Sequence, residues 1–395
     1  MNLKKTLTAL ALAASLYLPV KADPPPPQRT IQVDSNNPLT NAESNAKVYF
    51  SINESLGKAA DTLEKKHSLD KKPLGRLAQW IPLAYTNLAT GFYTHELGHH
   101  RVGKKSPHYT SKIDFGDWHK SVPNYIGHFK ARADNDIYRN IVISGLNQEE
   151  IDAHFNHTKT LDSQSFDQAI GFLARKFSML TYDGYSLNSF DTAKEGDVAW
   201  HLDWLNFDGI DMSRKDFYIQ AGISSALSTK TWDSLFTNIN YLFKGERTRK
   251  TTKIKLKDIE ITPPLVNLYL TPKGSFFNTA TYLKKKNLWE ISFGIDDTYI
   301  GESKLDRVRA GLKLVNKPIS DAERALQLSP FAYTNFSRKH LNPKGYSAGL
   351  ELFKPITKRL GISAKYEYNK DDVLENTVKG EDNGHNFTIG LEMKL

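Results

Sequence analysis

The 395-residue sequence contains no cysteine. Disulfide bonds, thiolate metal ligands, cysteine nucleophiles and lipidation of an N-terminal cysteine are therefore excluded. Long apolar runs are also missing beyond the extreme N-terminus, whereas a transmembrane helix needs about 18 or more such residues. A membrane protein built from spanning helices is not expected.

Neither sign of charge dominates, because 53 Lys and Arg residues face 44 Asp and Glu residues, for a net charge of +9. With 39% hydrophobic residues the chain can form a sizeable core, which excludes a disordered polymer. The basic excess is spread too thinly to indicate a nucleic-acid partner. Its one dense run, residues 244–257, suits a solvated loop or a surface for anionic lipid headgroups.

The N-terminus has the pattern of a secretory signal peptide. Lys4 and Lys5 precede an apolar run over residues 6–20, and Val20 and Ala22 are small residues at the two positions that a signal peptidase reads. We expect a signal peptide over residues 1–22 and an exported chain. Residues 23–45 contain four consecutive prolines and many polar residues, which predicts an extended, exposed leader rather than a strand or helix.

Residues 46–216 are predicted to be a mostly helical domain, because apolar residues recur there at three- and four-residue spacing. Within it, the uncharged segment 77–94 predicts a helix that is buried in the protein or touches a membrane. Gly103 is the expected stop signal of this helix.

The sharpest motif directly follows that segment, where residues 94–100 read THELGHH. His95 and His99 are four residues apart, so on a helix both imidazoles point to one side and can bind one Zn²⁺. Glu96 can then act as the general base toward a water on the open metal position. The motif resembles that of the zincin metallopeptidases, and this resemblance implies peptide hydrolysis with Zn²⁺ as cofactor.

The third metal ligand is not set by the motif. The metzincin pattern is disfavoured, because Val102 and Lys105 stand where it has Gly and His. The gluzincin pattern takes a glutamate from a helix further downstream, and the segment 144–152 offers such a helix start. The resemblance therefore implies either Glu149 or Glu150 as the ligand.

Capping chemistry favours Glu149 over Glu150. Asn147 has the character of an N-cap, and Glu150, three residues later, is its capping-box partner. The resemblance then implies that Asp152 accepts a hydrogen bond from a ligating histidine and supports it. Three histidines remain alternatives for the third ligand, namely His119, His128 and His154.

From residue 217 onward the apolar residues recur with a period of two, which is typical of strands. The clearest segments are 289–295, 308–314, 346–352, 362–368 and 387–395, and weaker ones are 217–226, 235–243, 265–271, 276–283 and 331–338. The pattern, with a last strand that alternates up to Leu395, resembles the outer-membrane barrels of bacteria. We predict an antiparallel β-barrel of about eight to ten strands over 217–395. A soluble or periplasmic β-domain is the alternative.

Together these features predict an α+β protein: an exported zinc-dependent hydrolase, best interpreted as a metallopeptidase, seated in the bacterial outer membrane by the barrel. Its expected partners are a peptide or envelope-protein substrate and outer-membrane lipid, without nucleic acid. One alternative is a non-enzymatic outer-membrane barrel, a pore or structural protein, with a helical cap. Another is a metal-dependent enzyme acting on lipid or another envelope component, and the periplasm is the alternative location.

Overall fold

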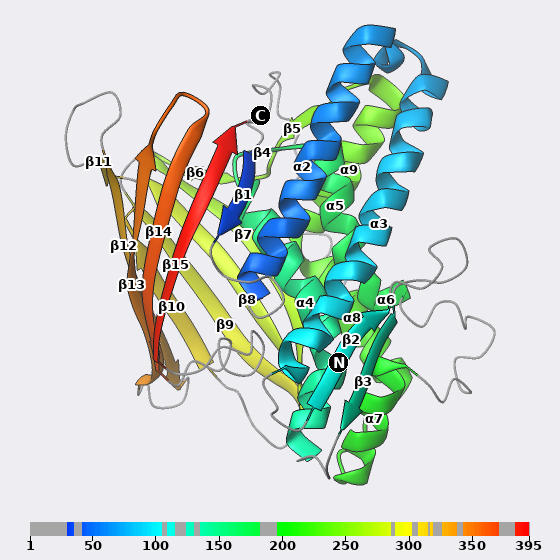
Figure 1. Ribbon diagram of the computed structural model, residues 1–395, viewed down its shortest axis with the longest axis vertical. Coiled ribbons are helices and arrows are strands. Elements are labelled where there is room, and N and C mark those ends of the chain that lie inside the picture. Colours follow the sequence, from blue (N-terminus) through cyan, green and yellow to red (C-terminus); the bar gives the residue numbers. More distant parts are fainter. Residues whose placement is uncertain are drawn as a thin grey trace.

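The computed structural model describes residues 30–34, 42–104, 109–114, 124–129, 135–181, 196–285, 289–301, 307–314, 317–318, 326–337, 343–370 and 384–394. A bundle of helices stands beside a curled antiparallel sheet (Figure 1), which confirms the mixed α+β class. The expected signal peptide, residues 1–22, lies outside the described residues.

The bundle is built mainly from α2 (Ala42–His67), α3 (Pro73–Gly103), α4 (Asn135–Lys159), α5 (Phe166–Lys176), α6 (Ser178–Thr181), α7 (Asp197–Phe207), α8 (Arg214–Leu227) and α9 (Thr229–Lys244). The short 3₁₀ turn η1 (Leu69–Lys71) joins α2 to α3, and a hairpin of β2 (Tyr109–Asp114) and β3 (Asn124–Phe129) precedes α4. In the described part of the chain, none of the helices is both long and apolar enough to cross a membrane.

The helices extend further along the chain than expected. The weak strand predictions at 217–226 and 235–243 are wrong, because these residues lie in α8 and α9. A capping box between Ser213 and Asp216 starts α8, and Gly245, with a φ of 79°, ends α9. These local start and stop signals outweigh a weak alternation of apolar residues.

The large sheet has eleven strands among the described residues, in the order β1-β15-β14-β13-β12-β10-β9-β8-β7-β6, with β11 paired to β12. Their bounds are β1 Thr30–Asp34, β6 Ile254–Leu256, β7 Ile259–Thr271, β8 Gly274–Lys285, β9 Trp289–Gly301, β10 Arg307–Lys313, β11 Lys317–Pro318, β12 Gln327–Ser337, β13 Pro343–Pro355, β14 Leu360–Lys370 and β15 Gly384–Lys394. A separate small pair joins β4 (Ser163–Ser165) to β5 (Thr248–Lys250). The segments predicted as strands from residue 265 onward coincide with β7, β8, β9, β10, β12, β13, β14 and β15. The segment 308–314 runs one residue past the end of β10, and residues 338 and 395 of two other segments lie outside the described residues.

Part of the predicted leader is a strand instead. β1 pairs antiparallel with β15 over its whole length, from Thr30 opposite Lys394 to Asp34 opposite Gly390. The expectation of a leader without strand or helix is wrong here, because the β-branched Ile31 and Val33 alternate with polar residues and meet a terminal strand that needs a neighbour. The last residues of the predicted leader, 42–45, already belong to α2.

The helices bind directly to the edge of β7. β6 covers only residues 259–261 of that strand, so residues 265–271 have no neighbouring strand on this side within the described part of the chain. Asn147 of α4 donates to the Leu270 carbonyl at 2.9 Å and accepts from the Leu270 amide at 2.8 Å. Ser228 accepts from the Val266 amide at 2.9 Å, and Lys176 donates to the Val266 carbonyl at 2.6 Å. Helix side chains thus satisfy the edge groups that a strand would otherwise satisfy.

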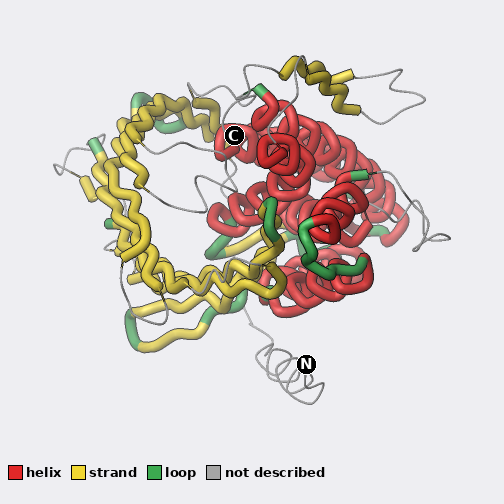
Figure 2. Tube along the Cα trace, turned by 90° about the horizontal axis from the view of Figure 1, so that it is seen from below, coloured by secondary structure: helices red, strands yellow, loops and turns green. Residues whose placement is uncertain are grey.

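The sheet curves around so that the helices stand between its two ends (Figure 2). Among the described residues no strand pairing joins β1 to β6, while α2 packs beside β1 and α4 and α8 pack against β7. Closure of the sheet into the predicted barrel therefore stays a prediction.

The interpretation of 144–152 as a helix start is wrong, because α4 begins at Asn135 and Asn147 lies inside it. Asn147 is not an N-cap, since its amide is engaged by Leu270. Glu150 is not a capping partner either, because Lys176 donates to its two carboxylate oxygens at 3.0 and 2.7 Å. Asn147 instead holds α4 against β7, and Glu150 holds it against α5.

Candidate metal centre

The long helix α3 carries the two motif histidines on its buried side. Pro73 occupies its first turn, where the missing N–H costs no hydrogen bond, and the helix ends at Gly103 as predicted. His95 and His99 lie one turn apart, and both are almost completely buried.

A third side chain meets them from a distant part of the chain. The Asp197 Oδ2 atom lies 2.8 Å from Nε2 of His95 and 3.0 Å from Nε2 of His99, and these two nitrogens are 3.0 Å apart. Around a tetrahedral ion with bonds of about 2.0–2.1 Å, ligand atoms lie about 3.3 Å from one another. Among the described residues, His95, His99 and Asp197 form the one group of this kind. Their spacing fits a single small cation.

The sequence analysis missed Asp197. It is the first residue of α7, directly after Gly196, whose φ of 116° lies in the region that favours glycine. An acidic residue in the first turn of a helix is common, since it interacts favourably with the helix dipole. Asp197 therefore does not stand out in the sequence as a candidate ligand. No spacing rule connects it to a motif about 100 residues earlier.

The other ring nitrogens of both histidines are also engaged. Nδ1 of His95 lies 3.1 Å from Oε1 of Glu149, and Nδ1 of His99 lies 2.6 Å from the Ile141 carbonyl. In the neutral rings each Nδ1–H donates to these acceptors, so each Nε2 carries a free lone pair toward Asp197. This is the tautomer that metal ligation at Nε2 requires.

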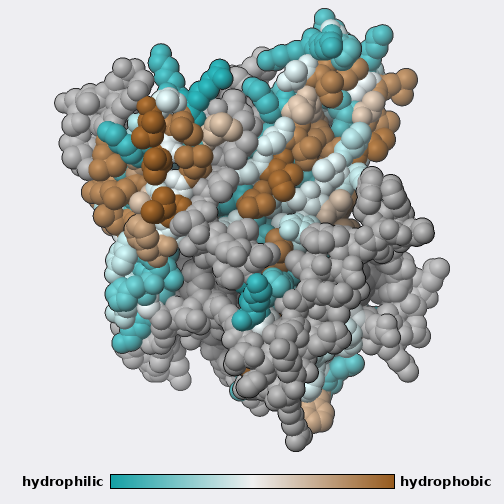
Figure 3. Space-filling view, in the orientation of Figure 1, coloured by the Kyte–Doolittle hydropathy of each residue, from teal (hydrophilic) through white to brown (hydrophobic). Residues whose placement is uncertain are grey.

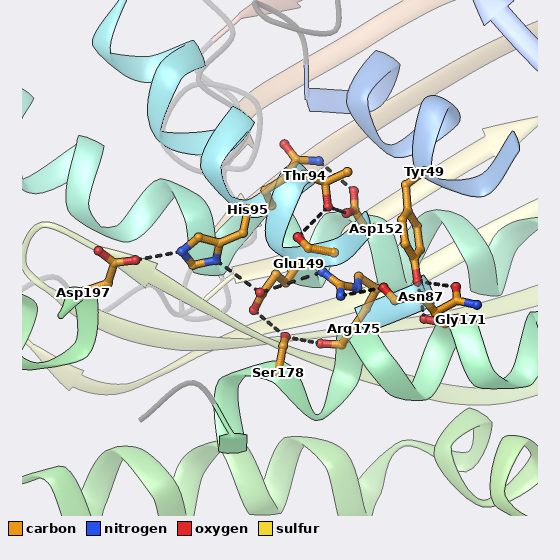
Figure 4. Close-up of polar contacts among 12 residues, drawn as sticks. Tyr49, Asn87, Thr94, His95, Glu149, Asp152, Gly171, Arg175, Ser178 and Asp197 are labelled. Atoms are coloured by element: carbon orange, nitrogen blue, oxygen red, sulfur yellow. Dashed lines mark hydrogen bonds and ion pairs between the residues drawn. The ribbon is translucent and has the colours of Figure 1, made fainter. Parts of the chain in front are cut away.

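Glu149 therefore lies behind His95, on the ring edge opposite Asp197 (Figure 4). Its carboxylate accepts a hydrogen bond from Ser178, and Nη1 of Arg175 lies 3.9 Å from it. Arg175 in turn stacks on the Tyr49 ring at 5.0 Å. The structure thus brings Glu149, the predicted metal ligand, to His95. Its carboxylate contacts Nδ1, however, and not the Nε2 atom that faces Asp197.

The remaining candidate ligands lie elsewhere. Glu150 is paired with Lys176, and His154 contacts Tyr282 and Asn267. His119 and the side chain of His128 lie outside the described residues.

Asp152 contacts none of the histidines whose side chains the structure describes. Its carboxylate accepts from Thr94 and from Gln148, each at 2.8 Å, and so links α3 to α4 one residue before His95. Burial raises the pKa of Asp152 to about 7, although Arg175 and these hydrogen bonds act in the opposite direction.

Two glycines allow α3 and α4 to approach at the site. A Cβ atom on Gly145 would lie 2.5 Å from Nε2 of both His95 and His99, and one on Gly98 would lie 2.6 Å from the Ser144 carbonyl oxygen. The absence of both side chains leaves a cradle around the two imidazoles, and a methyl group at position 145 would fill it.

The charges in the site suit a cation. Burial alone would lower the pKa of His95, but Glu149 and Asp197 raise it to about 10. Burial alone would raise the pKa of Asp197, but His99 and His95 hold it below its usual range. Without a metal, the two carboxylates thus hold protons on the imidazoles, and a divalent cation would take the place of that positive charge.

The predicted general base, Glu96, is buried on α3 beside these groups. The pKa of His99 is raised above its usual value. Burial alone would lower this pKa, but Asp197 and, to a smaller extent, the Glu96 carboxylate raise it. Glu96 therefore acts on the same ring electrostatically.

Comparisons with protein families, with curated proteins and with solved structures find no match to this chain.

Proposed function

We propose that the protein is a metal-dependent hydrolase in which His95, His99 and Asp197 hold one Zn²⁺ ion. The observation that carries this proposal is the triangle of two Nε2 atoms and Oδ2, with sides of 2.8 to 3.0 Å, in which both Nδ1 atoms are already engaged. Two imidazole nitrogens and one carboxylate oxygen form a ligand set that catalytic zinc sites use, with the fourth position left open.

Zinc in such a site lowers the pKa of a water and polarises a substrate carbonyl. The chain's own residues supply the other parts of the reaction. Glu96 accepts a proton from the attacking water and later returns it to the leaving group. Glu149 holds the His95 ring in the ligating orientation, and Ser178 holds Glu149. Asp197 balances the charge of the cation.

The substrate we propose is a peptide bond in an exported or envelope protein, and the sheet is proposed to seat the enzyme in the outer membrane. The two faces of the last strands support this membrane location of the sheet. Exposed apolar residues on β15 and β14 alternate with less exposed, mostly polar ones. The exposed apolar residues are Ile362, Tyr366, Phe387, Ile389, Leu391 and Met393. Lipid-facing strands of barrels alternate in this way.

The test compares wild type with Glu96→Gln, in which the amide keeps the shape of the side chain but cannot accept the proton. We expect about one zinc per chain in both proteins by elemental analysis. Hydrolysis of a peptide library and of isolated envelope proteins should fall about 10²- to 10⁴-fold in the variant. Glu246→Gln, which changes an exposed glutamate after α9, is the matched control and should keep full activity. Equal cleavage by wild type and Glu96→Gln contradicts the proposed role of Glu96.

A further inference from the structure

The polarity of α3 is inverted relative to that of a helix in a water-soluble bundle. Toward the other helices it buries mainly polar or small residues, namely Arg76, Gln79, Asn87, Gly91 and Thr94, together with Leu83. Toward the outside it exposes large apolar residues, namely Leu74, Leu77, Ile81, Tyr85 and Leu88. Leu74 is 80% exposed and Tyr85 is 73% exposed. In water the apolar stripe of a helix faces the core.

The neighbouring helix α9 shows the same inversion, and α2 adds two exposed large apolar residues. α9 buries Lys230, Thr231, Asp233, Ser234, Thr237 and Asn238, and exposes Phe236, Ile239 and Phe243, the last of them 77% exposed. α2 buries Asn45, Ser51, Asn53, Glu54 and Glu64 together with Tyr49 and Phe50, and it exposes Ile52 and Leu63 beside polar residues such as Lys58 and Thr62. On one side of the molecule, α3 and α9 therefore present an apolar face outward, and Ile52 and Leu63 of α2 lie beside it.

Hydrogen bonds between the helices satisfy many of the buried polar groups. Trp80 Nε1 donates to Asn238 Oδ1 at 2.8 Å, and the Tyr241 hydroxyl donates to Gln79 Oε1 at 2.8 Å. Arg76 donates to two backbone carbonyls at the end of α9, at 2.7 and 3.1 Å. A polar interior joined by interhelical hydrogen bonds is what helices in a lipid environment use to associate.

The sheet also has polar side chains on its inner side and apolar side chains on its outer side. Its inner side buries Ser329, Ser347, Glu367 and Asn369, and Ser347 donates to Glu367. Its outer side carries the exposed apolar residues of β14 and β15, with Leu312 and Tyr346. We call these outer residues, together with the exposed apolar residues of α2, α3 and α9, the apolar belt.

The belt continues from the strands to the helices. β1 pairs with β15 on one side and packs beside α2 on the other. Figure 3 shows apolar side chains on the strands and on the helices in the same upper half of the view, with hydrophilic side chains above the helices and below the strands. The hydrophilic end above the helices includes the exposed Lys65, Lys66, Lys71 and Lys72.

The two parts of the belt have the same length. Leu74 to Leu88 on α3 spans about 21 Å at 1.5 Å per residue. Phe387 to Met393 on β15 spans about 20 Å at about 3.3 Å per residue. Both approach the apolar band of about 25 Å on outer-membrane proteins. The lysines at one end are placed where anionic headgroups would lie.

We propose that α2, α3 and α9 face lipid acyl chains and complete the membrane-embedded surface that the outer side of the sheet begins. This proposal rests on the membrane seat proposed above for the strands, and not on the metal centre. A helix that touches acyl chains on one side needs only one apolar face, so its mean hydropathy stays low. His95 lies seven residues beyond Leu88, about 10 Å along the helix. The metal centre is then on the aqueous side, close to the boundary of the acyl chains.

The absence of native cysteine makes a direct test simple. The full chain carries one cysteine at a time, Ile81→Cys on α3, Ile389→Cys on β15 or Asp203→Cys on α7, each labelled with bimane. Asp203 is exposed and lies outside the belt. The proteins are reconstituted in phosphatidylcholine vesicles with or without bromine atoms at mid-chain, and circular dichroism checks that each variant keeps its helices.

We expect bimane fluorescence at positions 81 and 389 to fall in the brominated vesicles, because the bromine atoms lie at mid-chain and reach only labels that contact the acyl chains. Position 203 should be unchanged. Quenching at 389 without quenching at 81 overturns this inference and leaves the seat of the strands intact. Quenching at neither position overturns both. Protection of position 81 by a second copy, seen as a disulfide-linked dimer of unlabelled Ile81→Cys without quenching of the labelled protein, also overturns the inference.

Discussion

Oε1 of Glu149 lies 3.1 Å from Nδ1 of His95, on the opposite side of the imidazole ring from Asp197. One carboxylate is therefore placed to orient the ring, and the other is placed to complete the proposed ligand set. This division of labour gives separate expected outcomes for the two acidic residues.

Asp197→Ala should abolish binding of one zinc per chain, because it removes one of three ligand atoms and its negative charge. Asp203→Ala on the same helix is the control and should bind zinc as wild type does, since Asp203 is exposed. The measurement is elemental analysis after dialysis against a weak chelator. Full zinc retention in Asp197→Ala would exclude Asp197 as a ligand.

Glu149→Gln should weaken zinc binding about 10- to 100-fold without abolishing it, which is the usual effect of losing the carboxylate that supports a ligating histidine. Competition with a chromophoric chelator measures this change. Glu150→Gln is the contrast, because it disturbs the buried pair with Lys176 and not the site. It should lower stability with zinc affinity nearly unchanged. If Glu149→Gln lost zinc as completely as Asp197→Ala, Glu149 would be a ligand itself.

Gly145→Ala should prevent zinc binding by steric exclusion, because the added Cβ would lie 2.5 Å from both Nε2 atoms. Gly222→Ala on α8 is matched to it, since nothing lies within 4 Å of a Cβ built there. That control should bind zinc normally and gain up to about 1 kcal/mol of stability from the higher helix propensity of alanine. Zinc titration followed by thermal unfolding separates the two effects, and normal zinc binding by Gly145→Ala would disprove the cradle.

Asn147→Ala should destabilise the protein by about 2–6 kcal/mol, because it leaves both the amide and the carbonyl of Leu270 without their partner, at about 1–3 kcal/mol each. Asn240→Ala, which removes an exposed hydrogen bond to Glu246, should change stability by less than about 0.5 kcal/mol. Denaturant unfolding of both variants gives the comparison. Equal stability of the two would mean that Asn147 does not hold α4 to β7.

The sequence by itself determined the local parts of the site. The four-residue spacing of His95 and His99 places them on one face of any helix that contains them, because the helical period is the same in every protein. The clear strands from residue 289 onward were predictable for the same reason, since their period of two is a property of the extended backbone. The weak alternation of apolar residues in α8 and α9 predicted strands, but these segments are helices because capping residues set where they begin and end.

Only the tertiary structure decided which carboxylate reaches which nitrogen. Glu149 and Asp197 come from α4 and α7, 54 and 102 residues beyond His95 along the chain, and their places depend on how those helices pack against α3. The inverted polarity of α3 is hidden in the same way. Its apolar residues recur at helical spacing whichever way they face, and only the packing shows that Gln79 and Asn87 point inward and Ile81 and Tyr85 outward. Periodicity is a property of the local backbone, whereas the direction of a face is set by contacts between segments far apart in the chain.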